Sequence, residues 1–69
     1  MDSYDIAASI VIAHLESNRV INFRQLAKES QGASIEELGE LMFLCCEYGK
    51  ACADYEFNYL DFIQSLRGN

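Results

Sequence analysis

The sequence lacks proline altogether and contains only five Lys and Arg residues, one histidine and three cysteines among its 69 residues. It also lacks internal repeats and low-complexity tracts, so nothing in the chain is typical of a linker. A chain of this length removes only about 60% of its unfolded surface from water, which leaves no room for a second core. We therefore expect residues 1–69 to form a single small domain.

The three cysteines exclude the usual stabilising devices of a small domain. Cys45, Cys46 and Cys52 cannot all pair, and their spacing matches no metal-binding motif. Adjacent cysteines on a helix point about 100° apart, so Cys45 and Cys46 do not converge on one metal ion. The sequence predicts no metal and no cofactor, and it predicts three reduced thiols that are mostly protected inside the fold.

Positive charge is scarce and local. Eleven Asp and Glu residues give a net charge of -6, and residues 1–18 and 31–49 contain no Lys or Arg. Phosphate backbones and anionic membranes repel such a chain, so nucleic acid is not the expected partner. Arg19, Arg24 and Lys28 form the only basic patch, and they are the candidates for phosphate contact if nucleic acid is bound after all.

No stretch of the sequence has the character of a membrane helix. The longest strictly apolar run, Leu41 to Cys46, is far shorter than the roughly 20 residues that span a bilayer. The first residues, MDSYD, are acidic where a secretory signal is positive. Together with the free thiols, this predicts a cytoplasmic protein that contacts no membrane.

Two capped helices are predicted in the first half of the chain. Apolar residues recur at intervals of three and four over Tyr4 to Ser17, with Asp2 or Ser3 as the cap and His14 on the apolar stripe. A β-branched connector, Arg19 to Ile21, follows. Asn22 then caps a helix that ends near Ser30.

In that second helix, Asn22 is expected to accept a hydrogen bond from the amide of Gln25, while the Gln25 side chain reaches back to Asn22. Its narrow apolar edge consists of Phe23, Leu26 and Ala27.

A third helix is predicted from Ile35 to about Tyr48. Ser34 to Glu37 forms a capping box, and Gly49 is expected to end the helix in a left-handed conformation. The run from Leu41 to Cys46 points in every direction, so we expect protein to surround this helix. Gly39 lowers helix propensity, which the close approach of another helix would explain.

The last segment has two interpretations. Ala51 to Tyr59 alternates like a half-buried strand, whereas Asp54 to Leu66 carries a longer helical stripe with Asp54 as its cap. We favour the helix, which makes the fold class all-α. The prediction is a compact bundle of three to four short helices with a helix-turn-helix-like centre, and the alternative is a winged-helix-like fold with a minimal β element.

The order of these elements is similar to that of a known family. RVINFRQLAKES followed by SIEELGELMFLCCEYGKA resembles the helix-turn-helix core of winged-helix domains over roughly Ile10 to Ala51. In that family the third helix enters the major groove of DNA. The resemblance therefore implies a transcriptional regulator that binds DNA.

The residues themselves favour a different class of function. The third helix carries Glu36, Glu37, Glu40 and Glu47 and no cation, whereas groove readers present donors to bases and phosphates. Carboxylates at a helix start are usually solvated, and nothing places His14 beside a thiol with an orienting carboxylate, so no enzyme is predicted.

We predict a small acidic protein-protein interaction module that binds a larger protein as an inhibitor or adaptor. One possibility is a phage-type inhibitor that occupies a basic nucleic-acid-binding surface. On a last helix that starts at Asp54, Phe57 and Leu60 lie nearly opposite the core-facing stripe, which predicts a homodimer. The candidate interaction residues are Glu36, Glu37, Glu40, Glu47, Phe57 and Leu60.

Overall fold

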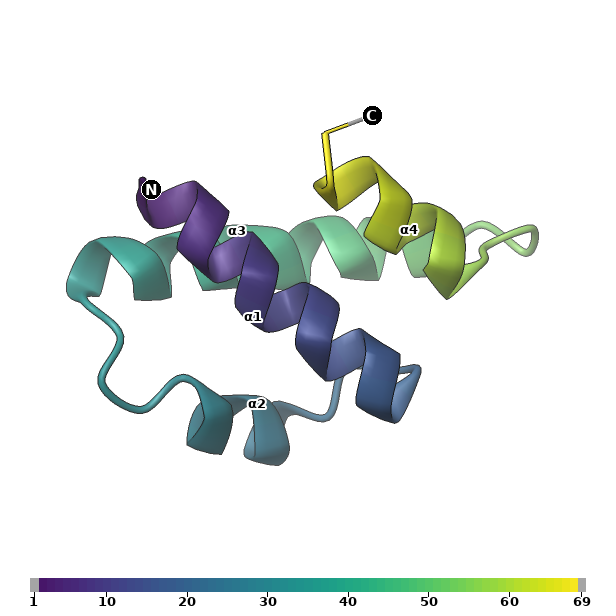
Figure 1. Ribbon diagram of the computed structural model, residues 1–69. Helices are drawn as coiled ribbons and strands as arrows, with labels where there is room; N and C mark the ends of the chain where they lie inside the picture. The colour runs from purple at the N-terminus through teal and green to yellow at the C-terminus, as the bar shows by residue number, and fades with distance from the viewer. Residues whose placement is uncertain (1, 69) are drawn as a thin grey trace.

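The computed structural model describes residues 2–68, which form four α-helices and contain no strand. The predicted all-α bundle is therefore confirmed, and neither the wing-like β element nor a strand over residues 51–59 is present in this part of the chain. In chain order the helices are α1, Ser3–Asn18; α2, Phe23–Glu29; α3, Ile35–Cys52; and α4, Tyr59–Leu66 (Figure 1).

The hydrophobic core lies where α1 crosses α3. Small residues on α1, Ala7 and Ala8, permit close packing, and α4 closes one end of the core. On the other side α2 rests mainly against α1 (Figure 1). The buried hydrophobic residues of this core are Ala7, Ala8, Val11, Leu15, Leu41, Leu44 and Ile63.

Both ends of α1 follow from local chemistry. Asp2, one of the two residues predicted as the cap, accepts a hydrogen bond from the Asp5 amide at 2.9 Å. At the other end Arg19 adopts a left-handed conformation, with φ of 65°, and its amide donates to the Leu15 carbonyl at 2.8 Å. The chain thereby turns back and leads directly into α2.

The predicted cap of α2 is confirmed, but its reciprocal contact is wrong. Asn22 accepts from the Gln25 amide at 3.1 Å. The Gln25 side chain points along the helix instead and donates to Glu29 Oε2 at 3.1 Å, because the Asn22 amide that it would accept from already donates to His14 Nε2 at 2.9 Å. Of the predicted apolar edge only Leu26 is buried, and Phe23 is 68% exposed.

Helix α3 begins as predicted and ends later. Both bonds of the capping box between Ser34 and Glu37 are present. Gly49 is not a left-handed cap, because the helix continues through it to Cys52. A side-chain carbon added at Gly39 would meet nothing within 4 Å in the described chain, so no helix of the same chain approaches it closely.

The expectation that α3 is surrounded by protein is also wrong for the single chain. Met42 is 71% exposed, and Phe43 beside it is exposed as well. The helix is buried only along the stripe that contains Leu41 and Leu44, where it meets α1.

The last helix starts at Tyr59, and its cap is Asn58 and not Asp54. Asp54 instead accepts from the Glu56 amide at 2.9 Å and holds a turn, so Phe57 precedes α4. Phe57 is half-buried against Tyr48, with ring centroids 5.4 Å apart. The expected placement of Phe57 opposite the core is therefore wrong, whereas Leu60 is 56% exposed.

Candidate functional site

An open apolar groove lies between α2 and α3. It has a volume of about 570 Å³. Apart from the thiols of Cys45 and Cys46, its only polar side chain is Ser30, whose hydroxyl donates to the Leu26 carbonyl of its own helix turn. The groove therefore offers mainly apolar contacts. Its walls consist of Phe23, Leu26, Ala27 and Ser30 from α2, and of Leu38, Leu41, Met42, Cys45 and Cys46 from α3.

The groove is open because α2 is short and packs on α1. Helix α2 has only seven residues, and the turn that follows it contains Gly32 in a left-handed conformation with φ of 87°. This turn carries the chain away to the start of α3, so no residue among 2–68 covers the flank of α3 that contains Leu38 and Met42. Sequence patterns identified this flank as apolar but assigned it to the interior.

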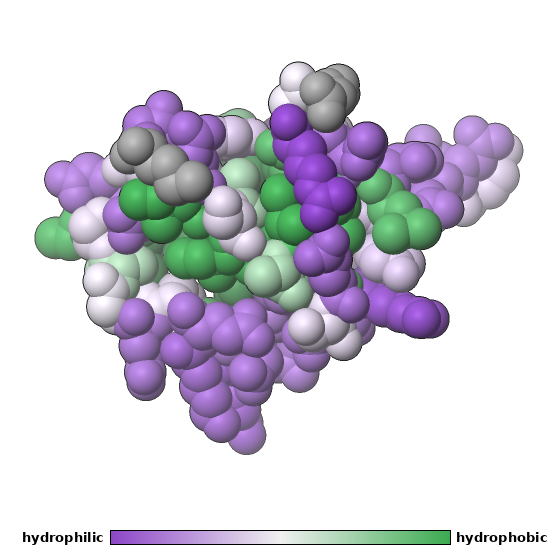
Figure 2. Space-filling view, viewed as in Figure 1, coloured by the Kyte–Doolittle hydropathy of each residue, from purple (hydrophilic) through white to green (hydrophobic). Residues whose placement is uncertain are grey.

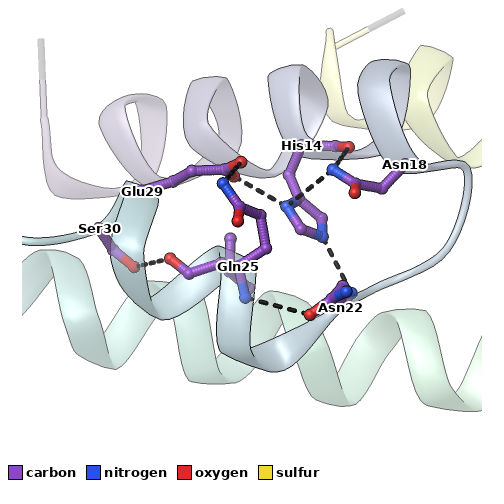
Figure 3. Close-up of polar contacts among 7 residues, drawn as sticks. His14, Asn18, Asn22, Gln25, Glu29 and Ser30 are labelled. Atoms are coloured by element: carbon purple, nitrogen blue, oxygen red, sulfur yellow. Dashed lines mark hydrogen bonds and ion pairs between the residues drawn. The ribbon is translucent and has the colours of Figure 1, made fainter.

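His14 connects α1 to both ends of α2 (Figure 3). The ring is 1% exposed. Its Nε2 accepts from the Asn22 amide at 2.9 Å, and its Nδ1 lies 2.8 Å from Glu29 Oε1. A backbone amide is always a donor, so Nε2 carries no proton and Nδ1–H donates to Glu29. The neutral ring thus fixes α2, which forms one wall of the groove.

Glu29 is held from two sides. Its Oε1 accepts from His14, and its Oε2 accepts from Gln25. The hydrogen bond from His14 holds the pKa of the Glu29 carboxyl below its ordinary value, and the bond from Gln25 acts in the same direction. The ionised carboxylate is therefore favoured by the fold.

This lowered pKa predicts a loss of stability in acid. The stabilisation from ionised Glu29 is complete above the ordinary pKa of 4.5 and is lost as the pH falls through the lower folded value. We expect the stability advantage of the wild type over Glu29→Gln, measured by urea unfolding, to shrink as the pH falls below about 4.5. A difference that stays constant from neutral pH into this range would contradict the role given to the carboxylate.

Three of the four predicted acidic residues lie together on α3. At about 100° per residue, Glu36, Glu40 and Glu47 fall within about 40° of one another on the helix surface. We call these three residues the acidic edge. Glu37 is separate, because its side chain turns back to the Ser34 amide in the capping box.

The basic residues border the opposite wall of the groove. Arg24 and Lys28 lie one turn apart on the outer side of α2, next to Ala27 of the groove wall, and we call them the basic edge. The space-filling view shows a hydrophilic surface in its lower part, where α2 lies (Figure 2). Within residues 2–68, the salt bridges leave Arg19, Arg24 and Lys28 without a carboxylate partner.

The thiols are less protected than predicted. Cys46 and Cys52 are exposed and Cys45 is half-buried. Cys46 lies on the flank of α3 that lines the open groove, and Cys52 is the last residue of the helix. Burial raises the pKa of the Cys45 thiol, with a smaller contribution from the neighbouring Cys46. Two of the three thiols, Cys45 and Cys46, line the groove.

The described residues show no other constellation with evident chemistry. Residues 2–68 contain no group of three or more His, Cys, Asp or Glu side chains that could hold a metal ion. None of the helices in this part of the chain has both the length and the hydrophobicity required to cross a membrane. Comparisons of the chain with protein-family models, with curated proteins and with solved structures give no match.

Proposed function

We propose that this protein is a small acidic interaction module that binds a larger protein, as an inhibitor or adaptor, without catalysing a reaction. The observation that carries this proposal is the open apolar groove between α2 and α3. Extended apolar patches on a soluble domain mark interaction sites. The exposed surface of 4762 Å² also exceeds the value of about 4,400 Å² that is typical of a monomer of 7.8 kDa.

The groove and its surroundings define the kind of partner. An apolar groove between two helices suits a row of apolar side chains, such as one face of an amphipathic helix. The net charge of -6 and the acidic edge attract a partner whose surrounding surface is basic, and they speed its association. The basic surface of a nucleic-acid-binding protein has this character.

A photo-crosslinking side chain in the groove tests this proposal. We would introduce it at Met42 in the groove or, as a control, at exposed Gln64 on α4, and irradiate each chain in extracts of the source cells. We expect a crosslink to a larger protein from position 42 and none from position 64. Leu38→Asp places a charge in the groove, so adding it to the chain with the crosslinker at position 42 should abolish the crosslink. Equal crosslinking from both positions would count against the proposal.

A DNA reader is the second candidate function. It is favoured by the exposed residues Arg19, Arg24 and Lys28, which have no carboxylate partner within residues 2–68 and lie around the first helix of the α2–turn–α3 segment. Two or three phosphate contacts give little affinity at physiological salt, however, and the acidic edge of α3 opposes them. We therefore rank this function below protein binding.

The two candidate functions predict different results with duplex DNA. We expect no sequence-selective binding at physiological salt in a fluorescence titration with random and genomic fragments. Weak binding at low salt should disappear in the double variant Arg24→Ala, Lys28→Ala. Sub-micromolar, selective binding at physiological salt would instead support the DNA reader.

A further inference from the structure

We infer that, in the free protein, a second copy of the chain covers the groove in a two-fold dimer, which must open before the larger partner binds. This inference rests on the proposed function, because it requires the groove to be a protein-binding surface. It adds a regulatory step, in which self-association and partner binding compete for the same residues of α2 and α3.

The distribution of charge around the groove supports a second copy as its occupant. A two-fold axis pairs one surface with itself, so that surface must be complementary to itself. The apolar residues of this face have the basic edge, Arg24 and Lys28, on the side of α2. The acidic edge, Glu36, Glu40 and Glu47, lies on the far side of α3. A two-fold axis that passes through the apolar centre and runs parallel to the two edges places each basic edge against the acidic edge of the other copy.

The lack of ion pairs on the basic edge fits this arrangement. The chain has eleven acidic residues, yet within residues 2–68 the salt bridges include neither Arg24 nor Lys28. The acidic edge is also mostly free, since its only salt bridge is the exposed pair of Glu47 with Lys50 at 3.3 Å. Both edges thus remain available to a second copy.

The apolar centre of the face has the features of an interface. Phe23, Met42 and Phe43 are large and exposed, and they lie between the two charged edges. Gly39 is on the same open side of α3, where its missing side chain permits close approach of a second backbone. A standard interface covers about 800 Å² per partner. That area is about a sixth of the exposed surface of 4762 Å².

This surface replaces the one that the sequence predicted. The sequence placed self-association on the third and fourth helices through Phe57 and Leu60. In the structure Phe57 packs against Tyr48 and Phe62 of its own chain, so its ring is not free to contact a second copy. The large exposed hydrophobic side chains beside the groove belong to α2 and α3.

A charge exchange between the two edges tests the dimer. The first variant, Arg24→Glu with Lys28→Glu, makes both edges acidic. The second, Glu40→Lys with Glu47→Lys, leaves only Glu36 as a carboxylate of the acidic edge, so both edges carry a net positive charge. We expect each variant alone to self-associate at least about tenfold more weakly than the wild type, because like charges then face each other twice. An equimolar mixture should form a heterodimer, because both contacts are then between opposite charges. Light scattering gives the masses, and circular dichroism confirms that both variants are folded.

Three results would overturn the dimer: a wild-type chain that stays monomeric at several hundred micromolar, variants that dimerise as well as the wild type, or folded variants that fail to associate on mixing. Met42→Asp provides a second perturbation, and it should give a folded monomer. If the wild type is monomeric while position 42 still crosslinks to a larger protein, only the dimer fails. If neither self-association nor crosslinking to a larger protein depends on the groove residues, the proposed function fails as well.

Discussion

Replacing His14 by alanine should destabilise the protein by about 3 to 5 kcal/mol, which approaches the whole stability expected of a domain this small. The ring is 1% exposed, so its removal leaves a cavity between α1 and α2. It also removes the acceptor of the Asn22 amide and the donor to Glu29, which lie at opposite ends of α2. Urea unfolding followed by circular dichroism measures the loss.

Asn18→Ala is the matched control for this substitution. Asn18 lies one turn from His14 on α1, and its side-chain amide donates to the His14 carbonyl at 2.9 Å and lies 3.4 Å from the ring Nδ1. We expect this change to cost about 1 kcal/mol or less. If both variants unfold at the same urea concentration, the His14 ring does not hold α2 in place.

Leu44→Ala should have a comparable effect, with a loss of about 2 to 5 kcal/mol. Leu44 is 1% exposed and lies in the α3 stripe that packs on α1, so the shorter side chain leaves a cavity at the centre of the core. Leu60→Ala makes the same chemical change at a side chain that is 56% exposed, and it should cost about 0.5 kcal/mol or less. Equal losses for the two variants would contradict the observed core.

Features set by neighbouring residues could be predicted from the sequence. The N-terminal caps of the first three helices depend on contacts between residues three positions apart, as in Asn22 with Gln25 and Ser34 with Glu37. The grouping of Glu36, Glu40 and Glu47 likewise needs only the helical repeat. These parts of the fold and of the candidate site were accessible without knowledge of tertiary packing.

Features set by competition between alternatives were not predictable in the same way. Asp54 suits both a helix cap and a tight turn, and the turn occurs because it brings Phe57 against Tyr48. The apolar run of α3 indicates a helix with apolar residues on every side. It does not show which of these sides packs against another helix of the same chain. The groove therefore emerges only when α2 is placed against α1 through His14, whose role depends on contacts across as many as 15 residues.

The most direct test of the central claim, that the α2–α3 groove is a protein-binding surface, is the alkylation rate of Cys46 relative to Cys52. Both thiols are exposed in the single chain, but only Cys46 lines the groove, so Cys52 is an internal reference in the same molecule. Brief alkylation followed by peptide mass spectrometry gives the ratio across protein concentrations and after addition of source-cell extract. We expect Cys46 to become progressively protected relative to Cys52 as either concentration or extract is increased. A ratio that changes neither with concentration nor with extract would contradict it.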